Sequence, residues 1–306
     1  MPRRPSPTPR CGEPYARPMT RFGAIEAGGT KFVCAVGTGP GDIVDRVRIP
    51  TTTPDETLGA VSDYFRGRAV EAVGIATFGP VEIRPSHPHF GRIGRTPKPG
   101  WEGADLVAAV TRVLDVPVAV DTDVNGAALA EALWGAGQDK STVLYITVGT
   151  GLGGGAAIDG RTLRGLVHPE MGHVSVGRLA DDRFPGVCPF HGDCLEGMAS
   201  GTALQARWGR SAAELGPDHD AAVVIEAHYL AAGFRQFVYT LAPEVIVMGG
   251  GVAHLGGLHE AVNRTLVEMM NGYSVQPEHA RGFVVPPGLG DDAGVAGALA
   301  LAAGTA

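Results

Sequence analysis

Two turns rich in glycine and threonine, each between two apolar runs, constrain the fold of this chain more than any other feature. The first, "GAIEAGGTKFVCAVG", connects apolar residues 22–26 and 32–36, and the second, "TVLYITVGTGLGGGAAIDG", connects residues 143–148 and 156–158. Apolar runs on both sides of a tight turn predict a β-hairpin. Helical and strand patterns alternate after each hairpin. The sequence therefore predicts an α/β chain of two similar halves, with a cleft between them as the natural ligand site.

The two turns also predict a phosphate-binding site. Successive backbone N–H groups in a glycine-rich turn form a concave anion site, glycine permits close approach, and a threonine hydroxyl adds a donor. A hairpin without a ligand is the alternative for either turn alone. Two such turns at corresponding places favour a nucleotide whose phosphates lie between them. The residues concerned are Gly28, Gly29, Thr30, Lys31, Gly149, Thr150 and Gly151.

Two other nucleotide-binding motifs are excluded. Gly149, Gly151 and Gly154 formally match G-x-G-x-x-G, but a strand-like pattern follows where a dinucleotide-binding fold needs a helix. A P-loop motif does not occur in the sequence.

Composition excludes several classes of protein. The formal net charge of the 306 residues is −7, with both signs mixed along the chain, which disfavours binding to nucleic acid. No apolar run reaches the roughly 18 residues of a membrane span. Residues 1–20 are rich in proline and arginine and predict a disordered tail. Four cysteines and no export signal indicate a reducing, cytoplasmic setting, in which we expect Cys11 and Cys34 to be inert.

The stretch "CPFHGDC" contains three potential metal ligands, Cys188, His191 and Cys194. A closed zinc site needs four nitrogen or sulfur ligands and leaves no position for a reactive water, so such a zinc would be structural. His173 in "HPEMGH" is the nearest candidate for the fourth ligand, and His168 is the alternative. A disulfide is disfavoured in a reducing setting, and free thiols on a loop remain the other interpretation.

Six motifs occur in a characteristic order: "GAIEAGGTK", "DTDVNGAALAE", "ITVGTGLGGG", "HPEMGH", "CPFHGDCLEG" and "DDAGVAGAL". Together they resemble the ROK family of sugar kinases (repressor, open reading frame, kinase), and most closely its fructokinase branch, from about residue 21 to the C-terminus. The resemblance implies an actin-like (ribonuclease H-like) ATPase fold, ATP with Mg²⁺, a homodimer, and His173 as the fourth zinc ligand. We expect one α/β domain in residues 21–121 plus 291–306, and a second, zinc-binding one in residues 122–290.

The resemblance also implies roles for residues on the sugar side. Asp123 corresponds to the base that accepts the proton of the attacking hydroxyl. A helix cap is the alternative role for this aspartate, and the base would then be Asp121 or Glu170. Glucokinase-like members have Asn-Asp at this point, where the chain has Thr-Asp, so glucose is disfavoured. The expected sugar-binding residues are Thr122, Asn125, Glu170 and Glu196.

Residues on the nucleotide side follow in the same way. Glu26 stands where many members have an aspartate directed toward Mg²⁺. The pattern "VIVMGGGVAH" is a strand, a glycine turn and a helix, which the family uses to bind adenosine. The corresponding residues are Gly249, Gly250, Gly251, Val252 and Ala253, with Thr202 as a further candidate.

The predicted activity is the ATP-dependent phosphorylation of fructose to fructose 6-phosphate. A mannokinase or a glucokinase is the alternative within the same class. The family also includes sugar-responsive repressors, which need an N-terminal DNA-binding domain, whereas the predicted core begins near residue 21.

Overall fold

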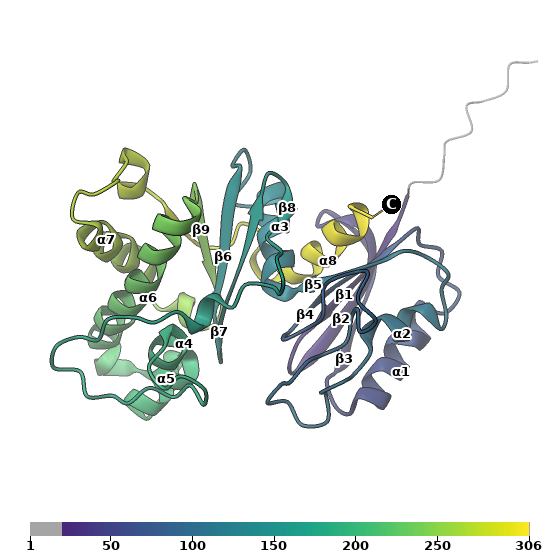
Figure 1. The fold of residues 1–306 in the computed structure, drawn as a ribbon, viewed down its shortest axis with the longest axis horizontal. Coiled ribbons are helices and arrows are strands. Elements are labelled where there is room, and N and C mark those ends of the chain that lie inside the picture. The colour runs from purple at the N-terminus through teal and green to yellow at the C-terminus, as the bar shows by residue number, and fades with distance from the viewer. Residues whose placement is uncertain (1–19, 306) are drawn as a thin grey trace, which may run out of the picture.

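The computed structural model describes residues 20–305 and contains two lobes, each built on a five-stranded mixed sheet (Figure 1). Most of the predicted tail, residues 1–19, and Cys11 within it lie outside the described residues.

The two sheets have the same topology. In the first, the order is β3-β2-β1-β4-β5, and in the second it is β8-β7-β6-β9-β10. In both, the first three strands of this order pair antiparallel and the remaining pairs are parallel. The strands are β1 (Phe22–Ala27), β2 (Lys31–Gly39), β3 (Asp42–Pro50), β4 (Val73–Thr77), β5 (Val118–Thr122), β6 (Thr142–Val148), β7 (Leu152–Ile158), β8 (Arg161–Thr162), β9 (Val245–Gly249) and β10 (Val284–Val285). The predicted duplication of an α/β unit is therefore confirmed.

Helices cover both faces of each sheet. The α-helices are α1 (Pro54–Phe65), α2 (Leu106–Thr111), α3 (Asp123–Trp134), α4 (Leu195–Ala199), α5 (Gly201–Trp208), α6 (His219–Leu241), α7 (Leu258–Met270) and α8 (Ala293–Ala303). In the first lobe, α1 and α2 lie on one face of the sheet and α8 on the other (Figure 1). In the second lobe, α3 packs on β6 and β7, and α4, α6 and α7 form the main core on the opposite face.

Helices α3 and α8 lie between the two sheets and pack on each other (Figure 1). Their backbones meet at two glycines: a Cβ added at Gly297 would lie 2.4 Å from the carbonyl carbon of Gly126. The surrounding residues are mostly alanines, such as Ala76, Ala128 and Ala298, all completely buried. Small side chains let the two helices approach closely, so this crossing determines how the lobes meet.

Three local expectations differ from the structure. Strand β3 was not expected, because four of its nine residues are charged and interrupt the apolar ones, and most of the strand is exposed. The pattern of residues 104–114 predicts a helix, but α2 is only six residues long. The sequence before His173 favours the edge of a strand, whereas Met171–His173 form a 3₁₀ turn. Each of these segments depends on tertiary pairing more than on its own pattern.

The expected division into domains remains a proposal. Helix α3, which we assigned to the second domain, packs against α8 of the first as well as against β6 and β7. Among the helices of residues 20–305, none combines the length and the hydropathy needed to cross a membrane.

The α3–α8 crossing generates a prediction on stability. In Gly297→Ala the new methyl group would clash with the backbone of Gly126, so we expect about 1–3 kcal/mol of destabilisation. Gly59→Ala is the matched control, because this glycine also lies inside a helix but a Cβ there meets nothing within 4 Å. This control should gain about 0.5–1 kcal/mol. Thermal unfolding measures both, and equal melting temperatures for the two variants would contradict the role of the crossing.

Candidate active site

A cavity of about 400 Å³ lies where the carboxyl ends of strands from both sheets meet. Its lining includes Glu26 at the end of β1, Asp123 at the start of α3, and the turn 249–251 after β9. Asp291, just before α8, and Gly294, in its first turn, complete the lining. Ligands of α/β sheets bind outside the carboxyl ends of the strands, and this cavity has that position.

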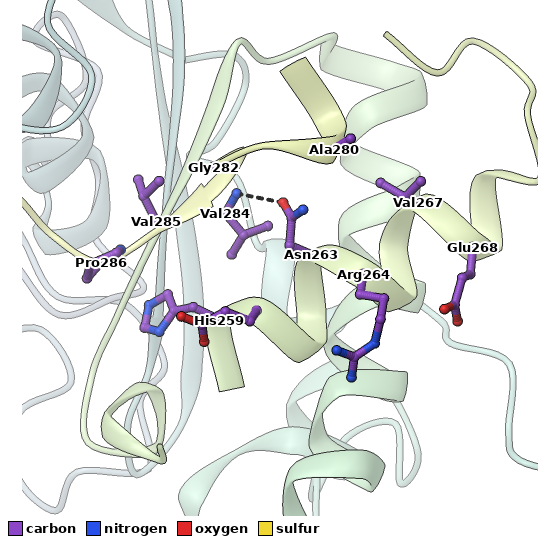
Figure 2. A pocket seen from close by; sticks show the side chains of 11 residues that line it. His259, Asn263, Arg264, Val267, Glu268, Ala280, Gly282, Val284, Val285 and Pro286 are labelled. Atoms are coloured by element: carbon purple, nitrogen blue, oxygen red, sulfur yellow. Dashed lines mark hydrogen bonds between the residues drawn. The ribbon is translucent and has the colours of Figure 1, made fainter. Parts of the chain in front are cut away.

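A second cavity, of about 640 Å³, lies between helix α7 and strand β10 (Figure 2). The side chain of Asn263 in α7 accepts a hydrogen bond from the N–H of Val284 in β10 at 3.1 Å, which joins these two lining elements. It shares only His259 and Pro286 with the smaller cavity and contains none of the predicted site residues. The smaller cavity is therefore the candidate active site.

Asp123 is the first residue of α3 and not its cap. The hydroxyl of Thr122 caps the helix by accepting the N–H of Asn125 at 3.2 Å, while the Asp123 carboxylate accepts only the adjacent N–H of Val124, at 2.9 Å. Burial raises the pKa of Asp123 to about 6, and the negative charge of Glu170 adds to this effect. A carboxylate with such a pKa is well matched to accepting a proton near neutral pH.

Glu26 is the second carboxyl group on the cavity wall. Burial, and after it the charge of Asp123, raise its pKa to about 7, although Lys31 and Arg46 act in the opposite direction. Gly294 lies directly against this side chain, since a Cβ added there would be 2.5 Å from its carboxyl carbon. Two partly buried carboxyl groups that repel each other form a site that favours a cation.

The carbonyl groups of the first turn, residues 28–31, accept hydrogen bonds from other groups of the protein. The N–H of Gly28 donates to the carbonyl of Lys31 at 3.0 Å, and the Thr51 hydroxyl donates to the carbonyl of Gly28 at 2.8 Å. The ammonium group of Lys98 donates to the carbonyl of Gly29.

The second turn, residues 149–151, is held in a similar way by the start of α5. The N–H of Gly201 donates to the carbonyl of Gly149 at 2.7 Å, and the hydroxyl of Thr202 donates to the carbonyl of Thr150 at 2.8 Å. Thr202, a candidate for binding adenosine, is therefore bonded directly to the second turn. In both turns, carbonyl groups are bonded within the protein, which favours an anion over a cation as the ligand.

The third turn, residues 249–251, contributes backbone to the cavity wall. Gly250 has φ 93°, and a Cβ there would lie 2.5 Å from the carbonyl oxygen of Val148, so only glycine fits. Val252 and Ala253 follow in a short 3₁₀ turn and are buried. Their side chains therefore pack in the core, and any ligand contact from them would come from the backbone.

Asn125, which we expected to help shape the sugar pocket, is bonded within the protein interior. Its amide group donates to Asp121 at 2.8 Å and to the carbonyl of Leu163 at 3.1 Å, and it accepts the N–H of Ala156 at 3.1 Å. The side chain is completely buried. These three bonds use its polar atoms for positioning α3 against β7.

Asp121 is completely buried as well, and its other carboxylate oxygen is paired with the Nε of Arg164 at 2.9 Å. It is therefore committed to a structural network and poorly placed to act as a base. Sequence reasoning missed Arg164, which lies in a loop with no motif of its own.

The two glutamates expected on the sugar side have different surroundings. The side chain of Glu170 is half exposed and lies 3.5 Å from the Nδ1 of His168, and its charge influences Asp123. Glu196 accepts the N–H of Leu152 at 3.0 Å, directly after the second turn. Glu170 is therefore free to bind a ligand, whereas Glu196 also supports the second turn.

The Cys/His cluster consists of His173, Cys188, His191 and Cys194, whose ligand atoms all lie within 4.8 Å of one another. The Nδ1 of His173 is 3.8 Å from the sulfur of Cys188 and 3.6 Å from that of Cys194, and the Nδ1 of His191 is 3.7 Å from Cys188. Tetrahedral zinc bonds of about 2.0–2.3 Å give separations of about 3.4–3.8 Å between ligands. The cluster fits a zinc ion, and both cysteines are free of disulfides.

His168, the alternative fourth ligand, is not part of this cluster. Its buried ring accepts the N–H of Val81 at 3.3 Å and so connects the two lobes. Within residues 20–305 the Cys/His cluster is the only close group of three or more potential metal ligands.

Comparison with known proteins agrees with this architecture. The model of the ROK family matches residues 22–305. The chain is 45% identical to a putative fructokinase of Bacillus subtilis (strain 168), over 92% of this chain and 95% of that protein. It is also 45% identical to a fructokinase of Zymomonas mobilis, over 92% and 96% of the two chains. A glucokinase of Streptomyces coelicolor is 28% identical, over 91% and 96%.

Among solved structures, a ROK hexokinase from Thermus thermophilus superposes with a TM-score of 0.74 at 28% identity, covering 93% of this chain and 98% of that one. The paired sheets, the cleft between them and the Cys/His cluster thus occur in a chain that matches the family along almost its whole length. The two lobes form an actin-like ATPase fold, and the protein belongs to the ROK family.

Proposed function

We propose that the protein is a fructokinase, which transfers the γ-phosphoryl group of ATP to fructose and releases fructose 6-phosphate and ADP. The observation that carries this proposal is the 45% identity to fructokinases over more than nine-tenths of the chain. The lower identity of 28% to a glucokinase favours fructose over glucose. The site supports the same reaction, because the wall of the candidate cavity includes Asp123, whose pKa burial raises to about 6, together with the glycine turn 249–251.

In this proposal Asp123 acts as the general base. The sugar hydroxyl loses its proton to the carboxylate as its oxygen attacks the γ-phosphorus, and ADP leaves with the electron pair of the broken bond. The N-terminal end of α3 holds Asp123 at a fixed position, because Thr122 caps the helix and Asn125 ties it to β7. Asp121 and Glu170 are weaker candidates, since the first is paired with Arg164 and the second is half exposed.

In this proposal the sugar is bound by Glu170, Glu196 and the hydroxyl of Thr122. A carboxylate accepts hydrogen bonds from two hydroxyl groups, so it orients a polyol well. Thr122 accepts the helix N–H and still has its own proton to donate. Asn125 is a positioning residue in this scheme, because its amide group has no free polar atom on the cavity side.

The nucleotide is bound by backbone groups of the three turns, 28–31, 149–151 and 249–251. Glu26 fits a Mg²⁺ ion bound with ATP, because its buried carboxyl group lies in a negatively charged wall and carboxylate oxygen is a preferred magnesium ligand. Such an ion neutralises phosphate charge. The Cys/His cluster fits a structural zinc, which would fix the segment between Glu170 and Glu196. A homodimer and a cytoplasmic location remain predictions of the sequence.

A panel of hexoses tests the proposed substrate. In a coupled assay of ADP release, kcat/KM should be highest for fructose, ahead of mannose and glucose, because the fructokinases are the more similar relatives. A value for glucose that equals or exceeds that for fructose would overturn the substrate while leaving the kinase activity in place.

Asp123→Asn separates the chemistry from the fold. The amide cannot accept the sugar proton, so kcat should fall by about 10²–10⁴-fold. The pKa of Asp123 is raised on folding, so its ionised form costs stability above its normal pKa. The variant should therefore melt at the same or a higher temperature at pH 7. Asp55→Asn is the matched control, because Asp55 occupies the first turn of α1 but is exposed, and it should keep full activity.

The same group predicts the pH dependence. Protonation of Asp123 removes the base, so kcat/KM of the wild type should decline as pH falls through about 6. An Asp123→Asn variant with wild-type kcat, or a profile flat down to pH 4, would assign the base elsewhere.

Removal of the metal tests the Cys/His cluster. Metal analysis should find about one zinc per chain, and Cys194→Ser should lose most of it, because three ligands do not close the site. The variant should melt at a lower temperature and show a raised KM for fructose, since Glu196 follows two residues later. Cys34→Ala is the control, as this buried cysteine of β2 lies outside the cluster and its loss should leave the zinc content unchanged. A zinc-free wild type, or a Cys194→Ser variant of unchanged stability, would argue against the site.

A further inference from the structure

Lys98 has so far been described only as a donor that holds the first turn. It belongs to the stretch "TPKPGW" and is one of three lysines in the sequence, with Lys31 and Lys140. Its ammonium group donates to the carbonyl of Gly29, in the middle of the first turn. Lys98 therefore brings a full positive charge to a turn whose backbone is arranged for phosphate.

The segment that carries Lys98 is held firmly in the first lobe. Trp101 is completely buried, donates from its ring N–H to the carbonyl of Thr52 at 3.0 Å, and packs between Phe32 and Phe78 with ring centres 5.3 and 5.6 Å away. The N–H of Trp101 also bonds to the carbonyl of Lys98. The backbone at Lys98 is therefore anchored to the core only three residues away.

The other end of this segment reaches the sugar side. The N–H of Gly94 donates to the carbonyl of Pro80 at 2.7 Å, and the next residue, Val81, donates to His168. His168 in turn lies beside Glu170, one of the proposed sugar ligands. The segment 94–98 thus connects the first turn, through Lys98, with residues 80–81, of which Val81 bonds to His168.

The charge of Lys98 is not neutralised by the protein. No ion pair within 4.0 Å joins Lys98 to a carboxylate of residues 20–305. An ammonium group has three donors, and the Gly29 carbonyl uses one of them. Two donors and a full charge remain for an anionic ligand.

We propose that Lys98 is a catalytic residue of the kinase reaction, whose ammonium group binds oxygens of the phosphoryl group during its transfer and then the 6-phosphate of the product. The inference rests on the proposed function. The oxygen–phosphorus bond to ADP breaks, the bond to the sugar oxygen forms, Asp123 takes the hydroxyl proton, and Lys98 keeps its own. Its contribution is charge stabilisation, which is often the largest factor in phosphoryl transfer.

Lys98→Met tests the charge, because methionine keeps much of the length of the side chain without the ammonium group. A charge-assisted hydrogen bond corresponds to about 10–100-fold in affinity, so we expect losses of that size in kcat and in the affinity for fructose 6-phosphate. The affinity for fructose should change by less than about twofold, since fructose carries no charge for the lysine to bind. Calorimetry with fructose and fructose 6-phosphate measures both affinities without turnover.

Two further variants serve as comparisons. Lys98→Arg keeps the charge and should restore part of the product affinity. Lys140→Met removes an exposed lysine just before β6, at the end of that strand opposite the second turn, and should behave as wild type. The melting temperature of Lys98→Met should stay close to that of the wild type, because one exposed hydrogen bond to a carbonyl contributes little to stability.

Three results would overturn the proposal: unchanged kcat and product affinity in Lys98→Met, equal losses for fructose and its phosphate, or a lower melting temperature with all ligands weakened alike. Turnover of fructose by the wild type tests the proposed function separately. If the wild type prefers another hexose, the same comparison is made with that sugar and its 6-phosphate.

Discussion

The contact between the backbones of α3 and α8 is the constraint on which the rest of the structure depends. One turn before Gly126, helix α3 begins at Asp123, and one turn before Gly297, helix α8 presents Gly294 to the side chain of Glu26. Because the two helices touch without side chains between them, the positions of the two carboxyl groups are determined together. The floor of the cleft is thus set by helix packing rather than by its loops.

A buried carboxylate holds the other end of α3. Glu131 is completely buried and accepts the N–H groups of Ala136, Gly288 and Leu289 at 2.7, 3.0 and 3.0 Å. These residues belong to the two segments through which the chain passes from one sheet to the other. A buried charge is tolerated when such bonds surround it, and a glutamine could not accept in the same way with its amino group. Glu131 therefore joins both connections at a single point.

The fold and part of the site could be predicted because their signals are local. The hairpin turns and three of the four Cys/His ligands each lie within a short stretch, so spacing alone reveals them. Asn125 shows why the rest could not be predicted. Its partners at positions 121, 156 and 163 come together only after β7 has packed on α3, and a motif match cannot tell a ligand contact from such a network. Glu131 is a second example, because a glutamate within a helical pattern is expected to face solvent, whereas this one is completely buried.

An acidic protein that binds a polyanion must neutralise phosphate charge locally. With a net charge of −7 and carboxyl groups on the wall of the cleft, no general attraction draws ATP into this site. Peptide N–H groups of the turns supply partial positive charges that do not depend on pH. Full charges are then needed only where the phosphoryl group is transferred, and two of the three lysines, Lys31 and Lys98, lie at the first turn. Burial is the main cause of the raised pKa values of Glu26 and Asp123, and the charges of neighbouring carboxyl groups act in the same direction. Burial thus gives Asp123 its basicity, and the same burial makes the cations at the first turn necessary.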